Sequence, residues 1–147
     1  MIETAELTAG SELDVLVAEK VMGLIACDQW QPMNLGSGGG PVMMGHSEKD
    51  SPHPGVNCYP AVPGSKHPYN GPQRYSMEIR AAWAVVEKLR PHYDFRLEVD
   101  TDKYWAMFAR VLKRTEDGAV AGPRCEAEAE TAPLAICLAA LMAISKR

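Results

Sequence analysis

One uninterrupted apolar segment, residues 132–144, limits the folds open to this chain more than any other feature. It carries no polar side chain except the thiol of Cys137. It is shorter than the roughly 18 apolar residues that a membrane-spanning helix needs. A helix that is apolar on all sides must be covered on more than one side. The segment therefore predicts a helix over residues 132–146, capped by Thr131, that lies between a sheet and another element or forms part of a subunit interface.

Three antiparallel strands are predicted before this helix, over residues 93–130. Apolar and polar residues alternate over 92–99, which indicates a strand with one buried face. The next strand, 103–113, is apolar on both faces and is therefore expected to be central, with cover above and below. The third strand, after a hairpin turn at 115–118, carries Pro123 and a row of glutamates, which suits an edge strand.

Two further helices are predicted, over residues 8–23 and 76–90. In the first, Thr8 or Ser11 is the expected cap, Asp14 is expected on the polar side, and Gly23 is expected to end the helix in a left-handed conformation. In the second, Ser76 is the expected N-cap and Pro91 ends the helix. Its predicted buried face consists of Ile79, Ala82, Trp83, Val86 and Leu89.

A long loop or lid is expected between these helices, over residues 31–73. It holds most of the chain's 11 prolines and 12 glycines, and this density prevents long helices and central strands. The predicted fold is therefore a single α+β domain, residues 1–147. Its antiparallel sheet of three or more strands is sandwiched between helices, and the loop adds a strand or two to the free edge.

Composition narrows the function classes. The chain of 147 residues has a net charge of −4 and a pI near 5.5, which argues against broad nucleic-acid binding. The N-terminus lacks the pattern of a signal peptide, and the four cysteines have no paired spacing. A cytoplasmic location without disulfides is expected.

Three blocks of sequence resemble a known family. They are ELD with LVAEKVMG at 12–14 and 16–23, YS with AAW and VVEKL at 75–76, 81–83 and 85–89, and EAETAPLAICLAAL at 128–141. Together they resemble the phage α-β-α sandwich domain family of small phage and prophage proteins. Members usually have a threonine after the tyrosine-serine pair, where this chain has Met77. The resemblance implies a fold and a phage origin, hence the cytoplasm of an infected bacterium, and it supplies no catalytic residues.

The loop offers two candidate sites, and neither is predicted to function. Zinc-type ligands are present, but their spacing matches no zinc pattern, so no metal is predicted. The glycine-rich run at 36–40 is followed by no lysine-serine or lysine-threonine pair, and a flexible hinge is the better interpretation. The zinc-type ligands in question are Cys27, His46, His53, Cys58 and His67.

A small-anion site is the preferred candidate. Arg74, Tyr75 and Ser76 precede a predicted helix N-terminus, and Arg80 follows one turn later. Backbone N–H groups, a hydroxyl and guanidinium groups are the partners that a phosphate prefers. Trp30 could stack on a flat ring. The alternative interpretation is that Ser76 only caps the helix, Tyr75 only packs, and the arginines are solvated.

The predicted function follows from this site. A non-enzymatic phage accessory protein that binds an anionic, nucleotide-type ligand and sequesters a host immune signal is the leading hypothesis, without any cofactor. The alternative is an interaction protein that acts on a host or phage protein and forms a homo-oligomer through residues 132–144. No arrangement of nucleophile, base and acid supports an enzyme.

Overall fold

The three-stranded antiparallel sheet is the base of the fold. The structure, a computed structural model, describes residues 7–33, 43–45, 58–65 and 70–145. Strands β5 (Tyr93–Asp100), β6 (Lys103–Thr115) and β7 (Gly118–Ala129) pair in the order β5-β6-β7. The α+β class and the central position of β6 are confirmed. The register of β6 against β7 shifts twice, between Ala109 and Lys113, and such bulges bend a strand and redirect its side chains.

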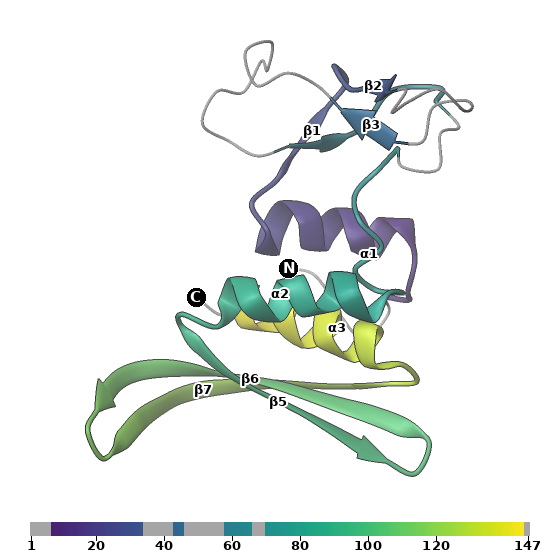
Figure 1. The fold of residues 1–147 in the computed structure, drawn as a ribbon. Helices are drawn as coiled ribbons and strands as arrows, with labels where there is room; N and C mark the ends of the chain where they lie inside the picture. Colours follow the sequence, from purple (N-terminus) through teal and green to yellow (C-terminus); the bar gives the residue numbers. More distant parts are fainter. Residues whose placement is uncertain (1–6, 34–42, 46–57, 66–69, 146–147) are drawn as a thin grey trace.

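Helix α3 (Ala132–Ser145) explains why its sequence lacks a polar face. It packs on β6 and β7 on one side and on α2 (Ile79–Leu89) and the end of the first helix on the other. Figure 1 shows α2 and α3 side by side on the same face of the sheet. The Thr131 hydroxyl accepts a hydrogen bond from the Leu134 N–H at 3.4 Å, which confirms the predicted cap. Burial within one chain thus accounts for the apolar helix without a second subunit.

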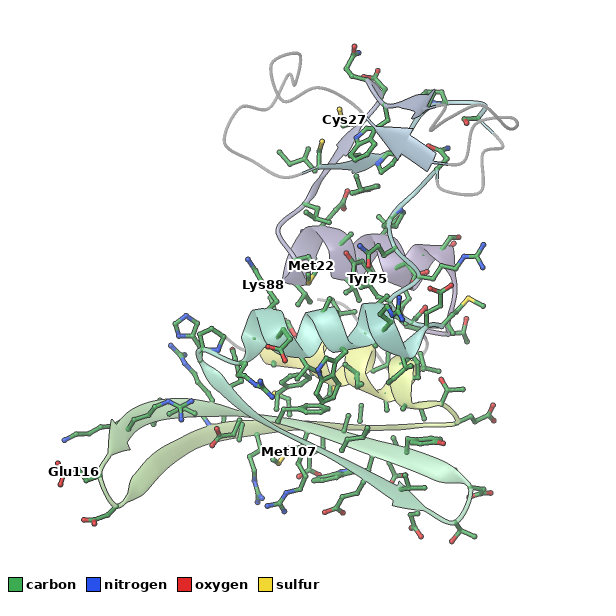
Figure 2. All side chains as sticks on the ribbon, in the orientation of Figure 1. Met22, Cys27, Tyr75, Lys88, Met107 and Glu116 are labelled. Carbon is green, nitrogen blue, oxygen red and sulfur yellow. The ribbon has the colours of Figure 1, made fainter. Side chains whose placement is uncertain are left out.

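Cover on both faces of the central strand was expected, but the described helices lie on one face of the sheet only. Met107 points away from the helices (Figure 2), and no described helix lies over it. It is nevertheless only 7% exposed. Its cross-strand neighbours are Arg96 and Glu126, whose aliphatic stems can cover apolar surface while their charges stay in water. An apolar residue on this face therefore does not require a second layer of helices.

Helix α2 keeps its predicted end but not its predicted start or its whole buried face. It ends at Leu89, before Pro91, and its N-cap is Glu78 rather than Ser76, without a side-chain cap. Its buried residues are Ala81, Ala82, Val85, Val86 and Leu89. The predicted core residues Ile79 and Trp83 are 52% and 43% exposed. The helix therefore begins later than predicted, and its buried face is turned toward Ala81, Ala82 and Val85, so that Ile79 and Trp83 lie partly in solvent.

The first helix changes its pitch before it ends. An α-helical part, α1 (Ser11–Leu16), continues into a π-helical part, η2 (Val17–Val21). Gly23 follows with φ +71°, and the Leu24 N–H bonds the Ala18 carbonyl at 2.9 Å. The left-handed glycine ending is therefore confirmed. The start is Gly10, with no side-chain cap, so the predicted caps Thr8 and Ser11 are wrong.

The described parts of the Pro/Gly-rich segment form short strands of their own. β1 (Ile25–Cys27) pairs in parallel with β4 (Cys58–Pro60), and β2 (Gln31–Met33) pairs antiparallel with β3 (Met43–Gly45). None of these strands joins the β5-β6-β7 sheet, so the predicted extension of that sheet is not seen in the part of the chain that the structure describes. Tyr59 anchors β4 in the core, and its hydroxyl donates to Glu19 at 3.1 Å. Residues 36–40, His46, His53 and His67 lie outside the described residues.

A buried hydrogen-bonded pair joins the first helix to the turn before α2. Asp14 and Ser76 are 4% and 0% exposed. The Ser76 hydroxyl and the Ser76 N–H both donate to Asp14 Oδ1, at 2.7 Å and 2.8 Å. The Gly10 N–H donates to Ser76 Oγ at 3.0 Å. The predictions that Ser76 caps α2 and that Asp14 lies on a polar face are both wrong, because each residue satisfies the other inside the protein.

This pair gives a stability prediction. Ser76→Ala removes one donor from a buried carboxylate, so we expect the free energy of unfolding to fall by about 1–3 kcal/mol. Urea unfolding followed by circular dichroism measures the change. Ser11→Ala, at an exposed site in α1, is the matched control and should stay within about 0.5 kcal/mol of the wild type. A Ser76→Ala protein as stable as the control would show that the Asp14–Ser76 contact does not stabilise the fold.

Candidate functional site

The residues of the predicted anion site do not come together as one site. Tyr75 is 1% exposed and belongs to the core, and Ser76 is engaged by Asp14. Burial, and then the charge of Asp14, raise the pKa of the Tyr75 phenol, so its hydroxyl stays neutral. Trp30 lies after β1, close to Cys58. Figure 2 shows Cys27 in the region of the short strands and Tyr75 near the helices.

Arg74 and Arg80 are the predicted site residues that remain available to a ligand. Both are exposed, and neither belongs to an ion pair within the described residues. They lie near the start of α2, where Glu78 provides no side-chain cap for the first-turn N–H groups. The local chemistry still suits an anion, but the tyrosine and the serine contribute to packing instead of to a ligand surface.

A surface cavity lies at the other end of α2. It has a volume of about 400 Å³ and is lined by His92, Tyr93, Arg110 and Val111. Its floor is fixed by the cross-strand pair of Tyr93 with Arg110 and by a hydrogen bond of 2.9 Å from the Val111 N–H to the His92 carbonyl. The Tyr93 ring is held edge-on to Phe108, with centroids 6.3 Å apart. The residues that line the cavity are therefore held in place by the sheet.

Arg110 is the cationic group of this cavity. It is exposed and has no ion-pair partner among the described residues, whereas nearby Arg90 lies 3.2 Å from Glu87. The register shift that follows Ala109 sets the local path of β6 here. An unpaired guanidinium beside an imidazole offers several N–H donors to a phosphate or carboxylate. The arrangement can therefore bind an anion.

Sequence reasoning did not single out His92 and Arg110. Both look like ordinary surface residues, and a β-bulge has no reliable signature in a single sequence. One signal was present. Arg110 is the only charged residue in the run YWAMFARVL of the central strand, and a charge in an otherwise apolar strand is unusual.

Three cysteines of the four are buried, and Cys58 is intermediate. Burial raises the pKa of the Cys58 thiol, the hydrogen bond with Trp30 opposes this, and the neighbouring thiol of Cys27 raises it again. Burial also raises the pKa of Cys137 far above its usual range, with a contribution from the charge of Asp14. Among the described residues, no cluster of three or more histidine, cysteine or acidic side chains could hold a metal ion.

The fold and the comparisons agree on the class of the protein. An antiparallel sheet packed against helices defines an α+β sandwich. The chain belongs to the phage ABA sandwich domain family, which it matches over residues 15–141. It is similar to the crystal structure of a phage protein from Bacillus cereus ATCC 14579, with 22% identity and a TM-score of 0.53. That likeness covers 96% of this chain and 97% of the other.

The likeness to that structure shows the fold alone at this level of identity. None of the curated proteins matches the sequence. In the described part of the chain, no helix is long and apolar enough to span a membrane.

The burial of the thiols gives a reactivity prediction. We expect iodoacetamide to label Cys58 in the folded protein and to leave Cys27, Cys125 and Cys137 unlabelled, because alkylation requires access and a thiolate. Since the pKa of Cys58 is raised, its labelling should be slow at neutral pH and accelerate as the pH rises above the usual thiol range. Peptide mass spectrometry measures the sites, with labelling of all four thiols in denaturant as the control. Equal labelling of Cys137 and Cys58 in the folded protein would contradict the packing of α3.

Proposed function

We propose that this phage protein binds a small anionic ligand of nucleotide type without transforming it. In this proposal it acts in the cytoplasm of the infected bacterium and sequesters a host immune signalling molecule. The observation that carries the proposal is the cavity of about 400 Å³ that presents Arg110 and His92. Pockets of roughly 300–1,000 Å³ with a few placed polar groups are typical of small-molecule sites.

The electrostatics of the cavity support an anion on balance. The cavity lies near the C-terminal end of α2, whose dipole disfavours a negative charge by up to about 1 kcal/mol. A hydrogen bond between a guanidinium and a phosphate contributes about 1.5–3 kcal/mol. Lys88 and Arg90 lie in the last turn and at the C-cap of the same helix and reduce the effect of its dipole. The favourable hydrogen bond from the Arg110 guanidinium therefore outweighs the unfavourable helix dipole, and the net interaction with an anion is attractive.

A second candidate function is supported by a different observation. Met77, Ile79 and Trp83 are large apolar side chains that are 58%, 52% and 43% exposed. They lie in α2 and the turn before it. Exposed apolar patches mark protein interaction sites, and tryptophan is enriched among residues that contribute most to binding. An interaction protein that acts on a host or phage protein would use this surface.

The ligand proposal predicts that Arg110 controls affinity. We expect the purified protein to bind at least one member of a panel of linear and cyclic mono- and dinucleotides, and to return it chemically intact. Arg110→Ala should weaken binding by roughly 10- to 100-fold, the equivalent of one charge-assisted hydrogen bond. Isothermal titration calorimetry measures affinity, and mass spectrometry of the recovered ligand tests for turnover.

Matched arginine variants locate the site. Arg124→Ala, on the edge strand β7 and outside the lining of the cavity, should bind as the wild type does. Loss of affinity in Arg74→Ala and Arg80→Ala, with Arg110→Ala unchanged, would move the site to the start of α2. If no nucleotide binds the wild-type protein, the ligand proposal fails and the interaction function remains. Altered ligand after incubation would indicate an enzyme.

A further inference from the structure

Strand β5 is a regular edge strand that lacks the proline, bulge and register shift found elsewhere in the sheet, and its charged side chains are its only protection against pairing. It pairs with β6 over its full length, from Tyr93 opposite Arg110 to Asp100 opposite Lys103, without a register shift. Among the described strands, none pairs with its other edge. The opposite edge strand, β7, carries Pro123 and a shifted register. Proline, bulges and irregular register hinder pairing with another chain, and β5 has none of them.

An apolar surface accompanies this open edge on the helix side of the sheet. Trp83 of α2 contacts Phe95 of β5 edge-on, with ring centroids 5.8 Å apart, and it is still 43% exposed. Ile79 lies one turn earlier on the same helix and is 52% exposed. Figure 1 shows α2 running along the side of the helix layer that lies over β5. A strand added to β5 would therefore meet apolar side chains as well as free backbone groups.

The side chains on the other face of β5 carry alternating charge. Asp94, Arg96 and Glu98 are all exposed. Neither Arg96 nor Glu98 takes part in an ion pair within the described residues, and Asp94 lies 3.8 Å from Arg114, with both side chains more than half exposed. Exposed pairs of this kind contribute little. The charges of β5 are thus available to an opposing strand.

The order of these charges makes β5 complementary to itself. When two identical strands pair antiparallel, residues equally distant from the centre lie opposite each other. With Phe95 at the centre, Asp94 of each strand lies opposite Arg96 of the other. On the apolar face, Tyr93 lies opposite Leu97. Both opposite-charge pairs and aromatic pairs stabilise antiparallel strands.

The neighbouring registers are less favourable. A pair centred on Arg96 places two arginines opposite each other and Asp94 opposite Glu98, so every charged contact is repulsive. A pair centred on Leu97 places Arg96 opposite Glu98 but also Asp94 opposite Asp100. Like charges directly opposite destabilise strand pairing. Only the register centred on Phe95 has complementary charges from Tyr93 to Leu97.

We infer that β5 pairs antiparallel with β5 of a second copy of this chain, about a two-fold axis at Phe95. The two three-stranded sheets become one continuous sheet, and the axis is perpendicular to it. Both α2 helices then lie on the same face of the joined sheet, where Trp83 and Ile79 become part of the contact. This surface is distinct from α3, which is buried within each chain, and the inference goes beyond the proposed ligand site.

Charge exchange within β5 tests the inference. We expect the wild type to form a dimer with a Kd of about 100 μM or tighter by sedimentation equilibrium. Asp94→Arg and Arg96→Asp each create two like-charge contacts per dimer, and each should weaken the dimer at least about tenfold. The double variant D94R/R96D restores both complementary contacts and should regain most of the affinity.

The design separates specific pairing from net charge. The chain has a net charge of −4, so a general charge effect would make Asp94→Arg associate more and Arg96→Asp associate less. Weakening by both, with recovery in the double variant, requires direct opposition. Arg114→Ala controls for the in-chain contact of Asp94. Glu116→Arg, in the β6–β7 turn far from the centre of β5 (Figure 2), controls for a surface charge reversal.

Engineered cysteines test the register. A mixture of Asp94→Cys and Arg96→Cys proteins should give an oxidised cross-linked dimer, because directly opposite residues in an antiparallel pair have the spacing a disulfide needs. Either protein alone should cross-link far less. A wild type that is monomeric at about 100 μM overturns the inference and leaves β5 open to a strand of another protein. A dimer unaffected by both single charge variants overturns it in favour of another interface.

Discussion

The buried contact between Asp14 and Ser76 is the interaction on which the rest of the architecture depends. A carboxylate that is 4% exposed is costly to bury unless it is hydrogen-bonded. Here one oxygen accepts bonds from both the hydroxyl and the N–H of a single serine. The contact joins residues that are 62 positions apart in sequence, with the whole Pro/Gly-rich segment between them. It fixes where the chain re-enters the helix layer, and hence where α2 begins.

The parts of the fold that could be predicted are those that local sequence determines. The alternation over β5, the central position of β6, the end of α2 before Pro91 and the cap at Thr131 were correct, because each follows from neighbouring residues. The expected burial did not extend to Val99, which is 67% exposed, and in the described part of the chain no helix covers the second face of β6. The role of Asp14 was not predictable in this way. Its helical spacing placed it on a polar face, and only a distant serine makes its burial possible. The exposure of Trp83 likewise depends on how far α2 overlaps the sheet.

The candidate site was less predictable than the fold for a related reason. Polar residues before a helix resemble an anion site, but the same residues can serve the core, as Tyr75 and Ser76 do. Arg74 and Arg80 remain exposed at the place the sequence indicated. Arg110 was missed because its surroundings are created by a register shift and by the return of the chain from α2 into β5. A cavity made by three-dimensional packing leaves no spacing pattern in a single sequence.

The two surfaces that could bind a partner are linked through α2 and β5. The cavity at His92 and Arg110 lies where α2 passes into β5, and the Trp83–Phe95 contact joins the middle of the same helix to the same strand. Because α2 starts at a position set by Asp14 and Ser76, a shift of that helix would alter the cavity and the β5 edge together. A rigid α2 is therefore a requirement for both surfaces. Burial of five α2 residues, on a helix that packs against α3 and η2, provides that rigidity.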